Sequence, residues 1–186
     1  MDLADPERAL TLSYAPQAVR PALATLWRLD ERLGQVVAAT RDARIGEIRL
    51  AWWREALEKL DTAPPPDEPV LRDVAAELVA RGLQGVVLSG VADGWSALLA
   101  TPIDDEALAV HAVERGGALF AAGARLLGGA FTGLQAAGEG WALVDLACHV
   151  REPAVAASAV AQAQVELGED AGLNDLVRVA LKRAAG

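Results

Sequence analysis

Nine prolines divide the chain into stretches rich in alanine and leucine, and this spacing most restricts the possible fold. They are Pro6, Pro16, Pro21, Pro64, Pro65, Pro66, Pro69, Pro102 and Pro153. Proline fits the first turn of a helix and disrupts its interior, so these positions indicate helix boundaries. Hydrophobic residues make up 53% of the 186 residues and aromatic ones only 4%, a mixture that favours helices over sheets. We expect one all-α domain of six to eight helices.

Within these stretches, apolar residues recur at helical spacing. Residues 17–39 are predicted to form a long amphipathic helix, and the next helix is expected to bury a stripe formed by Leu50, Trp53, Leu57 and Leu60. Further helices are predicted over 69–81, 83–99, 101–127 and 132–151, with one or two short ones after Pro153. Thr101 is the expected cap of the helix that begins in "TPIDDEAL".

The formal net charge of −9 disfavours nucleic acid as a partner, because the phosphate backbone is also negative. The first ten residues carry early acids and lack the apolar core of a signal peptide, and no later run resembles a membrane span. A cytoplasmic protein is therefore expected.

Few residues offer familiar catalytic or metal-binding chemistry. His111 and His149 lack the spacing of a metal motif, and Cys148 is the single cysteine, so all three are expected to be structural. The glycine-rich stretch "ERGGALFAAGARLLGG" lacks the lysine of a phosphate-binding loop, and close helix packing explains it better.

Acidic residues need separate attention, because a magnesium-diphosphate site on a helix requires two carboxylates four residues apart. Asp30 and Glu31 point in different directions, and the residue four after Asp30 is Gly34. We therefore expect the two acids to lie on a solvated face or to pair with Arg28 or Arg32.

The string "EIRLAWWREAL" is the most distinctive in the chain. Two adjacent tryptophans diverge on a helix, so we expect Trp53 to enter the core while Trp52 meets another helix or a cleft. Arg49 beside them is a candidate for contact with an anionic ligand.

Five stretches resemble the squalene and phytoene synthase family, in the family's order. The most specific is "IGEIRLAWWREAL", and the other four lie within residues 16–37, 89–98, 106–129 and 138–152. The resemblance implies an all-α, single-domain helical bundle of the isoprenoid synthase type over residues 1–186. It also implies a C-terminally shortened bundle, because active members continue with further helices.

In active members, a proline and an arginine precede a DDxxD motif. Carried over from Pro16 and Arg20, that motif falls on Gly34 to Ala38, where no acid occurs. The second acid motif corresponds to "WALVDLACHVREP", where Asp145 stands alone. Magnesium bound by such motifs neutralises the leaving group, so the resemblance implies no catalytic residue and no metal ligand here.

The chain is similar to a non-enzymatic branch of the family that includes a mitochondrial assembly factor for respiratory complex I. This implies a role in protein interaction or respiratory-complex assembly and no cofactor. The resemblance leaves open whether a remnant cavity binds an isoprenoid or lipid. The alternative is an active, magnesium-dependent prenyl-diphosphate transferase of squalene or phytoene biosynthesis. The client protein and oligomeric state stay open, as does peripheral contact with the inner membrane. The candidate remnant cleft consists of Arg20, Trp27, Gly34, Ala38, Arg49, Trp53 and Asp145.

Overall fold

The structure, a computed structural model, describes residues 3, 5–129 and 132–168, and most of these residues lie in helices. No strand occurs in those ranges, which confirms the expected all-α class. The α-helices are α1 (Pro6–Tyr14), α2 (Arg20–Ala38), α3 (Ala43–Lys59), α4 (Pro69–Glu77), α5 (Gly85–Leu88), α6 (Gly90–Ala97), α7 (Asp105–Val110), α8 (Ala118–Leu126), α9 (Leu134–His149) and α10 (Pro153–Leu167). A short 3-10 turn, η1 (Val79–Arg81), follows α4, and a π-helical segment, η2 (His111–Gly117), joins α7 to α8.

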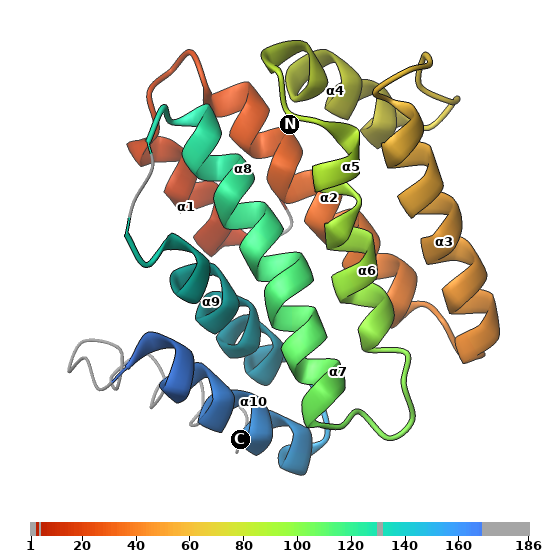
Figure 1. The fold of residues 1–186 in the computed structure, drawn as a ribbon, viewed down its shortest axis with the longest axis vertical. Coiled ribbons are helices and arrows are strands. Elements are labelled where there is room, and N and C mark those ends of the chain that lie inside the picture. The colour runs from red at the N-terminus through yellow and green to blue at the C-terminus, as the bar shows by residue number, and fades with distance from the viewer. Residues whose placement is uncertain (1–2, 4, 130–131, 169–186) are drawn as a thin grey trace.

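Together α7, η2 and α8 form one long helix through the middle of the bundle (Figure 1). This confirms the helix expected to end near residue 127, where Gly128 adopts a left-handed conformation with φ of 71°. The predicted cap was wrong, because the Asp104 carboxylate accepts the hydrogen bond from the Ala107 amide at 2.9 Å. Thr101 lies in the preceding loop.

The single helix expected over 83–99 is divided into α5 and α6. Asp61, from the turn after α3, accepts hydrogen bonds from the backbone amides of Gly85 at 2.6 Å and Val86 at 3.0 Å. These bonds satisfy the free amides at the start of α5, so a short helix begins there. The start of α5 at Gly85 is thus set by a distant side chain that local periodicity does not reveal.

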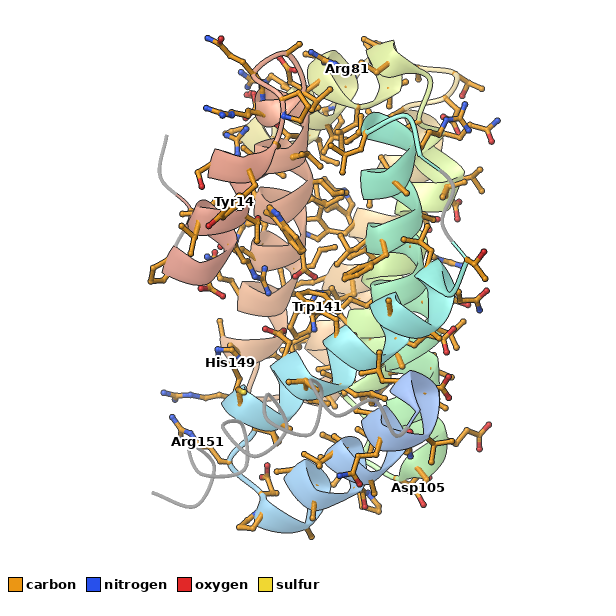
Figure 2. All side chains as sticks on the ribbon, turned by 90° about the vertical axis from the view of Figure 1, so that its left-hand side faces the viewer. Tyr14, Arg81, Asp105, Trp141, His149 and Arg151 are labelled. Atoms are coloured by element: carbon orange, nitrogen blue, oxygen red, sulfur yellow. The ribbon has the colours of Figure 1, made fainter. Side chains whose placement is uncertain are left out.

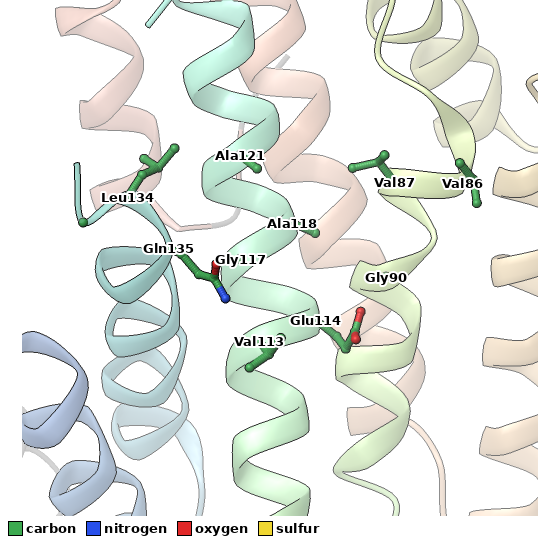
Figure 3. Close-up of a pocket in the computed structure, with 11 residues that line it drawn as sticks. Val86, Val87, Gly90, Val113, Glu114, Gly117, Ala118, Ala121, Leu134 and Gln135 are labelled. Carbon is green, nitrogen blue, oxygen red and sulfur yellow. The ribbon is translucent and has the colours of Figure 1, made fainter. Parts of the chain in front are cut away.

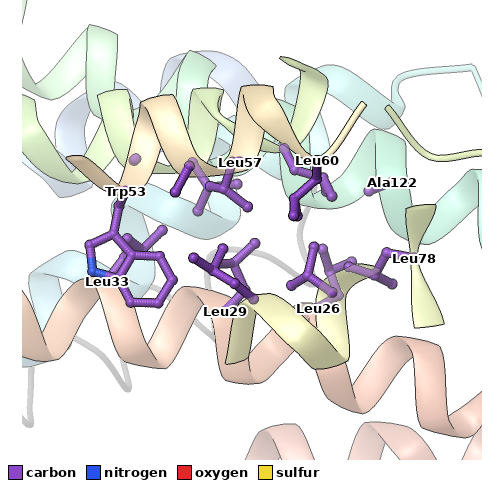
Figure 4. Packing of buried hydrophobic residues seen from close by; sticks show 14 of the residues in the cluster. Leu26, Leu29, Leu33, Trp53, Leu57, Leu60, Leu78 and Ala122 are labelled. Atoms are coloured by element: carbon purple, nitrogen blue, oxygen red, sulfur yellow. The ribbon is translucent and has the colours of Figure 1, made fainter. Parts of the chain in front are cut away.

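The larger core lies between α2, α3, α4 and α6. Leu50, Trp53, Leu57 and Leu60 are all buried, which confirms the stripe predicted on α3. Figure 4 shows part of this stripe opposite the leucines of α2. This packing fixes the inner face of α2, the face that carries the site described below.

A second core lies where α9 crosses η2 and is covered by α10. Gly116 of η2 and Gly138 of α9 meet backbone to backbone, leaving no room for a side chain at either position. Close helix packing through the glycine-rich stretch is thereby confirmed. Of the helices expected after Pro153, α10 is present, and the stretch "LVRVALKRAAG" lies outside the described residues. None of the described helices has the length and apolar character needed to cross a bilayer.

Candidate functional site: a central ion-pair cluster

Asp30 lies in the interior of the bundle with no exposed surface. The prediction that it lies on a solvated face or pairs with Arg28 or Arg32 was wrong. Its position on α2 falls within the buried stripe that contains Leu26, Leu29 and Leu33, so the side chain points inward with them.

The Asp30 carboxylate accepts four hydrogen bonds from three side chains. Arg115 donates Nε to Oδ1 at 2.7 Å and Nη2 to Oδ2 at 2.8 Å, a bidentate pair. The indole Nε1 of Trp95 donates to Oδ1 at 2.8 Å, and Nη1 of Arg8 donates to Oδ2 at 2.8 Å. Burial favours the neutral carboxyl, but the charge and hydrogen bonds of Arg115, the charge of Arg8 and the hydrogen bond from Trp95 hold the pKa of Asp30 below its ordinary value.

Arg115 is the second fully buried charge, and η2 places it at the centre of the bundle. Its Nη2 donates to Oδ2 of Asp145, on α9, at 2.6 Å. Burial opposes its charge, yet Asp30 and Asp145 together raise the pKa of Arg115. We call Asp30, Arg115, Asp145 and Arg8 the central ion-pair cluster; it contains two acids and two arginines and is electrically balanced.

His111 lies one turn before Arg115 and is also fully buried. Its Nδ1 lies 2.8 Å from the carbonyl oxygen of Gly94, which only accepts, so Nδ1 carries the hydrogen. Nε2 then accepts from Nη1 of Arg115 at 3.2 Å. Burial and the Arg115 charge lower the pKa of His111 to about 4, so the ring is neutral. This agrees with its expected structural role.

Tryptophan rings enclose the two arginines of the cluster. The Arg115 guanidinium lies 4.3 Å from the ring centre of Trp95 and 4.8 Å from that of Trp141. The Arg8 guanidinium lies 5.2 Å from the ring centre of Trp27 and 5.6 Å from that of Trp141. These distances allow cation-π attraction. Figure 2 shows Trp141, the ring shared by both arginines, pointing into the bundle.

The structure brings three of the seven candidate cleft residues to this cluster. Asp145 is a member of the cluster, and Trp27 is one of its enclosing rings. Gly34 lies beside the Trp95 ring, and a Cβ at Gly34 would lie 2.9 Å from the nearest ring carbon. Arg20 is exposed and donates to the carbonyl oxygens of Ala15 and Ser13.

Of the other three candidates, Ala38 and Arg49 are exposed, whereas Trp53 is buried in the larger core. Ala38 is exposed at the end of α2. Arg49 and Trp53 line a groove of about 460 Å³ between α2 and α3, where the half-exposed Trp52 is their neighbour. Trp52 therefore meets a groove, as expected.

A second concave region of about 670 Å³ lies beside η2 and α8, near the start of α9 (Figure 3). Val86, Val87 and Val113 contribute apolar side chains to its lining, and Glu114 contributes a charged one. It is separate from the central ion-pair cluster.

Sequence reasoning missed Arg8 and Arg115 as partners of Asp30. The available signal was the position of Asp30 at helical spacing from buried leucines, since a charge there requires an opposite charge in the interior. No local pattern indicates which arginine supplies that charge, because Arg115 is 85 positions away from Asp30.

The fold and the cluster define an all-α bundle with a charged, salt-bridged centre enclosed by aromatic rings. The chain belongs to the squalene/phytoene synthase family, whose model matches residues 1–169. The family expected from its motifs is thus confirmed.

A local similarity connects the chain with a different class of protein. Over 35 residues, 19% of the chain, it is 86% identical to the Holliday junction branch migration complex subunit RuvA of Novosphingobium aromaticivorans. The RuvA of Erythrobacter litoralis is 69% identical over 35 residues. The matched stretch spans 17% and 18% of those two proteins, so the chain covers less than a fifth of either curated relative. No solved structure shows significant similarity to the chain.

The residues present do not fit the magnesium site that active members of the family are expected to use. Both oxygens of Asp30 are bonded to nitrogen donors at 2.7–2.8 Å, and Asp145 is bonded to Arg115. Residues 34–38 supply no carboxylate. In the described ranges, no three His, Cys, Asp or Glu side chains are grouped to hold a metal ion.

Proposed function

We propose that the chain is a non-catalytic member of the family that acts by binding another protein, in the manner of a respiratory-complex assembly factor. The observation that carries this proposal is the bonding of Asp30 and Asp145 to Arg115 and Arg8. A diphosphate site needs carboxylates whose oxygens are available to a cation. Here Asp30 and Asp145 are neutralised by Arg115 and Arg8 of the same chain.

A protein contact at the surface is better supported than an isoprenoid held inside the bundle. The interior beside Gly34 contains the Trp95 ring, and two guanidinium groups with their tryptophans occupy the centre. The surface instead offers apolar residues: Ile48 is 71% exposed and Trp52 is 46% exposed beside the α2–α3 groove. We propose a cytoplasmic location without a cofactor.

DNA branch migration is not proposed, although two RuvA proteins share a short stretch with the chain. The shared stretch is 35 residues long, and the net charge of −9 disfavours binding to a phosphate backbone.

Product analysis tests the non-catalytic proposal directly. Purified protein is incubated with farnesyl or geranylgeranyl diphosphate and magnesium, next to an active member of the family as the positive control. We expect no squalene, phytoene or presqualene-type product. Turnover that disappears in Asp30→Asn would overturn the proposal and establish the prenyl-transferase alternative.

Native mass spectrometry tests the binding part of the proposal. The protein is purified from its own host, from soluble and membrane fractions separately, and the mass of the intact species is measured. We expect a retained protein partner. A retained isoprenoid or lipid with no protein partner would instead favour the remnant-cavity version.

A further inference from the structure

Arg8 is attached to α1 but makes its contacts with other helices. Its side chain is 10% exposed, whereas Leu10 and Tyr14 of the same helix are 59% and 85% exposed. Its guanidinium meets Asp30 and Trp27 of α2, and Asp145 and Trp141 of α9. Arg8 is thus held like a ligand in a site whose walls belong to α2 and α9.

Without Arg8, this site would carry an excess negative charge. Asp30 and Asp145 contribute two negative charges, and Arg115 supplies one positive charge. An uncompensated charge in the interior is costly, so the site favours a monovalent cation. The rings of Trp27 and Trp141 add attraction for a cation lying against their faces.

The geometry fits a planar guanidinium better than an ammonium ion. Asp30 Oδ2 accepts from Nη1 at 2.8 Å, while both oxygens of Asp145 lie 3.5 Å from Nη2. The two acceptors therefore meet different nitrogens of one flat group, which a compact, strongly hydrated ammonium does not offer.

Arg8 itself matches the site incompletely. Its Nε is buried and has no hydrogen-bond partner among the described residues, and the nearest ion-pair oxygen is Asp5 Oδ2 at 3.4 Å. A guanidinium that is not tethered to α1 is free to adjust its position between the same acceptors and rings.

We propose that Asp30, Asp145, Trp27 and Trp141 form a binding site for a monoalkylguanidinium cation, and that Arg8 is its resident ligand. This inference does not depend on the proposed function. In this view, α1 places the guanidinium of Arg8 in the site between α2 and α9.

Chemical rescue of Arg8→Ala tests this site. Thermal unfolding of the wild type and of Arg8→Ala is followed in methylguanidinium chloride, methylammonium chloride and sodium chloride at equal, millimolar concentrations. Methylguanidinium at ten times its Kd is expected to raise the Tm of Arg8→Ala by about 3–6 °C. The wild type, whose site is filled, is expected to show no such rise.

Two further variants separate a specific site from a general salt effect. In Arg8→Ala/Asp145→Asn, the excess charge is removed, and the rise in Tm should disappear. In Arg8→Ala/Asp73→Asn, which alters an exposed carboxylate, the rise should persist. An equal effect of methylammonium, an equal effect on the wild type, or no rise in Arg8→Ala would each overturn the proposal.

If Arg8→Ala does not fold in buffer alone, its refolding is measured in the same three salts. The variant is refolded from urea in each salt, and its helical circular dichroism signal is compared. Recovery in methylguanidinium alone supports the site. Equal recovery in all three salts, or recovery in none, contradicts it.

Discussion

Replacing Asp30 by asparagine tests whether the central ion-pair cluster is a structural element of the bundle. The substitution keeps the size of the side chain and removes its charge. Arg115 and Arg8 would then share the single carboxylate of Asp145, leaving one buried positive charge in excess. The amide nitrogen of asparagine would also face one of the donors that Asp30 now accepts from.

The expected loss is large because Asp30 and Arg115 have no exposed side-chain surface. Removing one partner of a buried ion pair costs about 3–5 kcal/mol of unfolding free energy. For a chain of this size, each kcal/mol lowers the Tm by about 2–4 °C, so a decrease of roughly 6–20 °C is expected.

Asp73→Asn is the matched control. Asp73 pairs with Arg28 at 2.9 Å, close to the distances in the cluster, but its side chain is 39% exposed. An exposed pair contributes about 0–1 kcal/mol. Urea and thermal unfolding, followed by circular dichroism, give both values.

A double variant, Asp30→Asn/Arg115→Met, completes the test. It leaves Arg8 and Asp145 as a balanced pair, so it should lose less stability than the sum of the two single variants. A loss in Asp30→Asn no greater than that in Asp73→Asn would refute the reasoning, because the buried charges would then not depend on one another.

Three other predictions follow from burial, spacing and protonation. Trp53→Ala, at a side chain 3% exposed, should lose about 3–5 kcal/mol in urea unfolding, against less than about 1 kcal/mol for Trp52→Ala at 46% exposure; equal losses would contradict the assigned faces of α3. Gly94→Ala should destabilise the fold, because the new Cβ would lie 2.5 Å from the backbone nitrogen of residue 115. Gly117→Ala, where a Cβ would meet no atom within 4 Å, should gain about 0.5–1 kcal/mol of unfolding free energy. Comparing the Tm of the two variants in a thermal-shift assay tests this difference. The pKa of His111 is lowered from 6.5 to about 4, so the unfolded chain takes up a proton at this residue before the folded chain does as the pH falls. About 3 kcal/mol of unfolding free energy should therefore be lost between pH 7 and pH 4. The variant His111→Gln should lack this part of the pH dependence.

The helices were largely predictable because their signals are local. Prolines mark helix starts at α4 and α10, and the stripe on α3 has a regular helical period. The start of α5 at Gly85 was not predictable, since it depends on hydrogen bonds that the Asp61 carboxylate, more than twenty positions earlier, accepts from the Gly85 and Val86 amides.

The cluster was not predictable in the same way. Charged residues in a helix are usually solvated, so Asp30 next to Glu31 indicated an exposed face. Its burial requires partners from η2 and α1, and no local pattern shows that those elements meet at α2. Asp145, chosen because the family resemblance places the second acid motif in its region, lies in the cluster, where Arg115 compensates its charge.

The contact between Gly34 and Trp95 limits which side chains position 34 can carry. The family resemblance predicts that the acid motif would begin at Gly34, and a Cβ there would lie 2.9 Å from the Trp95 ring. A new acid at this position collides with an indole whose Nε1 is bonded to Asp30. A carboxylate at position 34 would therefore require a second change that moves or replaces Trp95, and that change would disturb a hydrogen bond to the central ion-pair cluster.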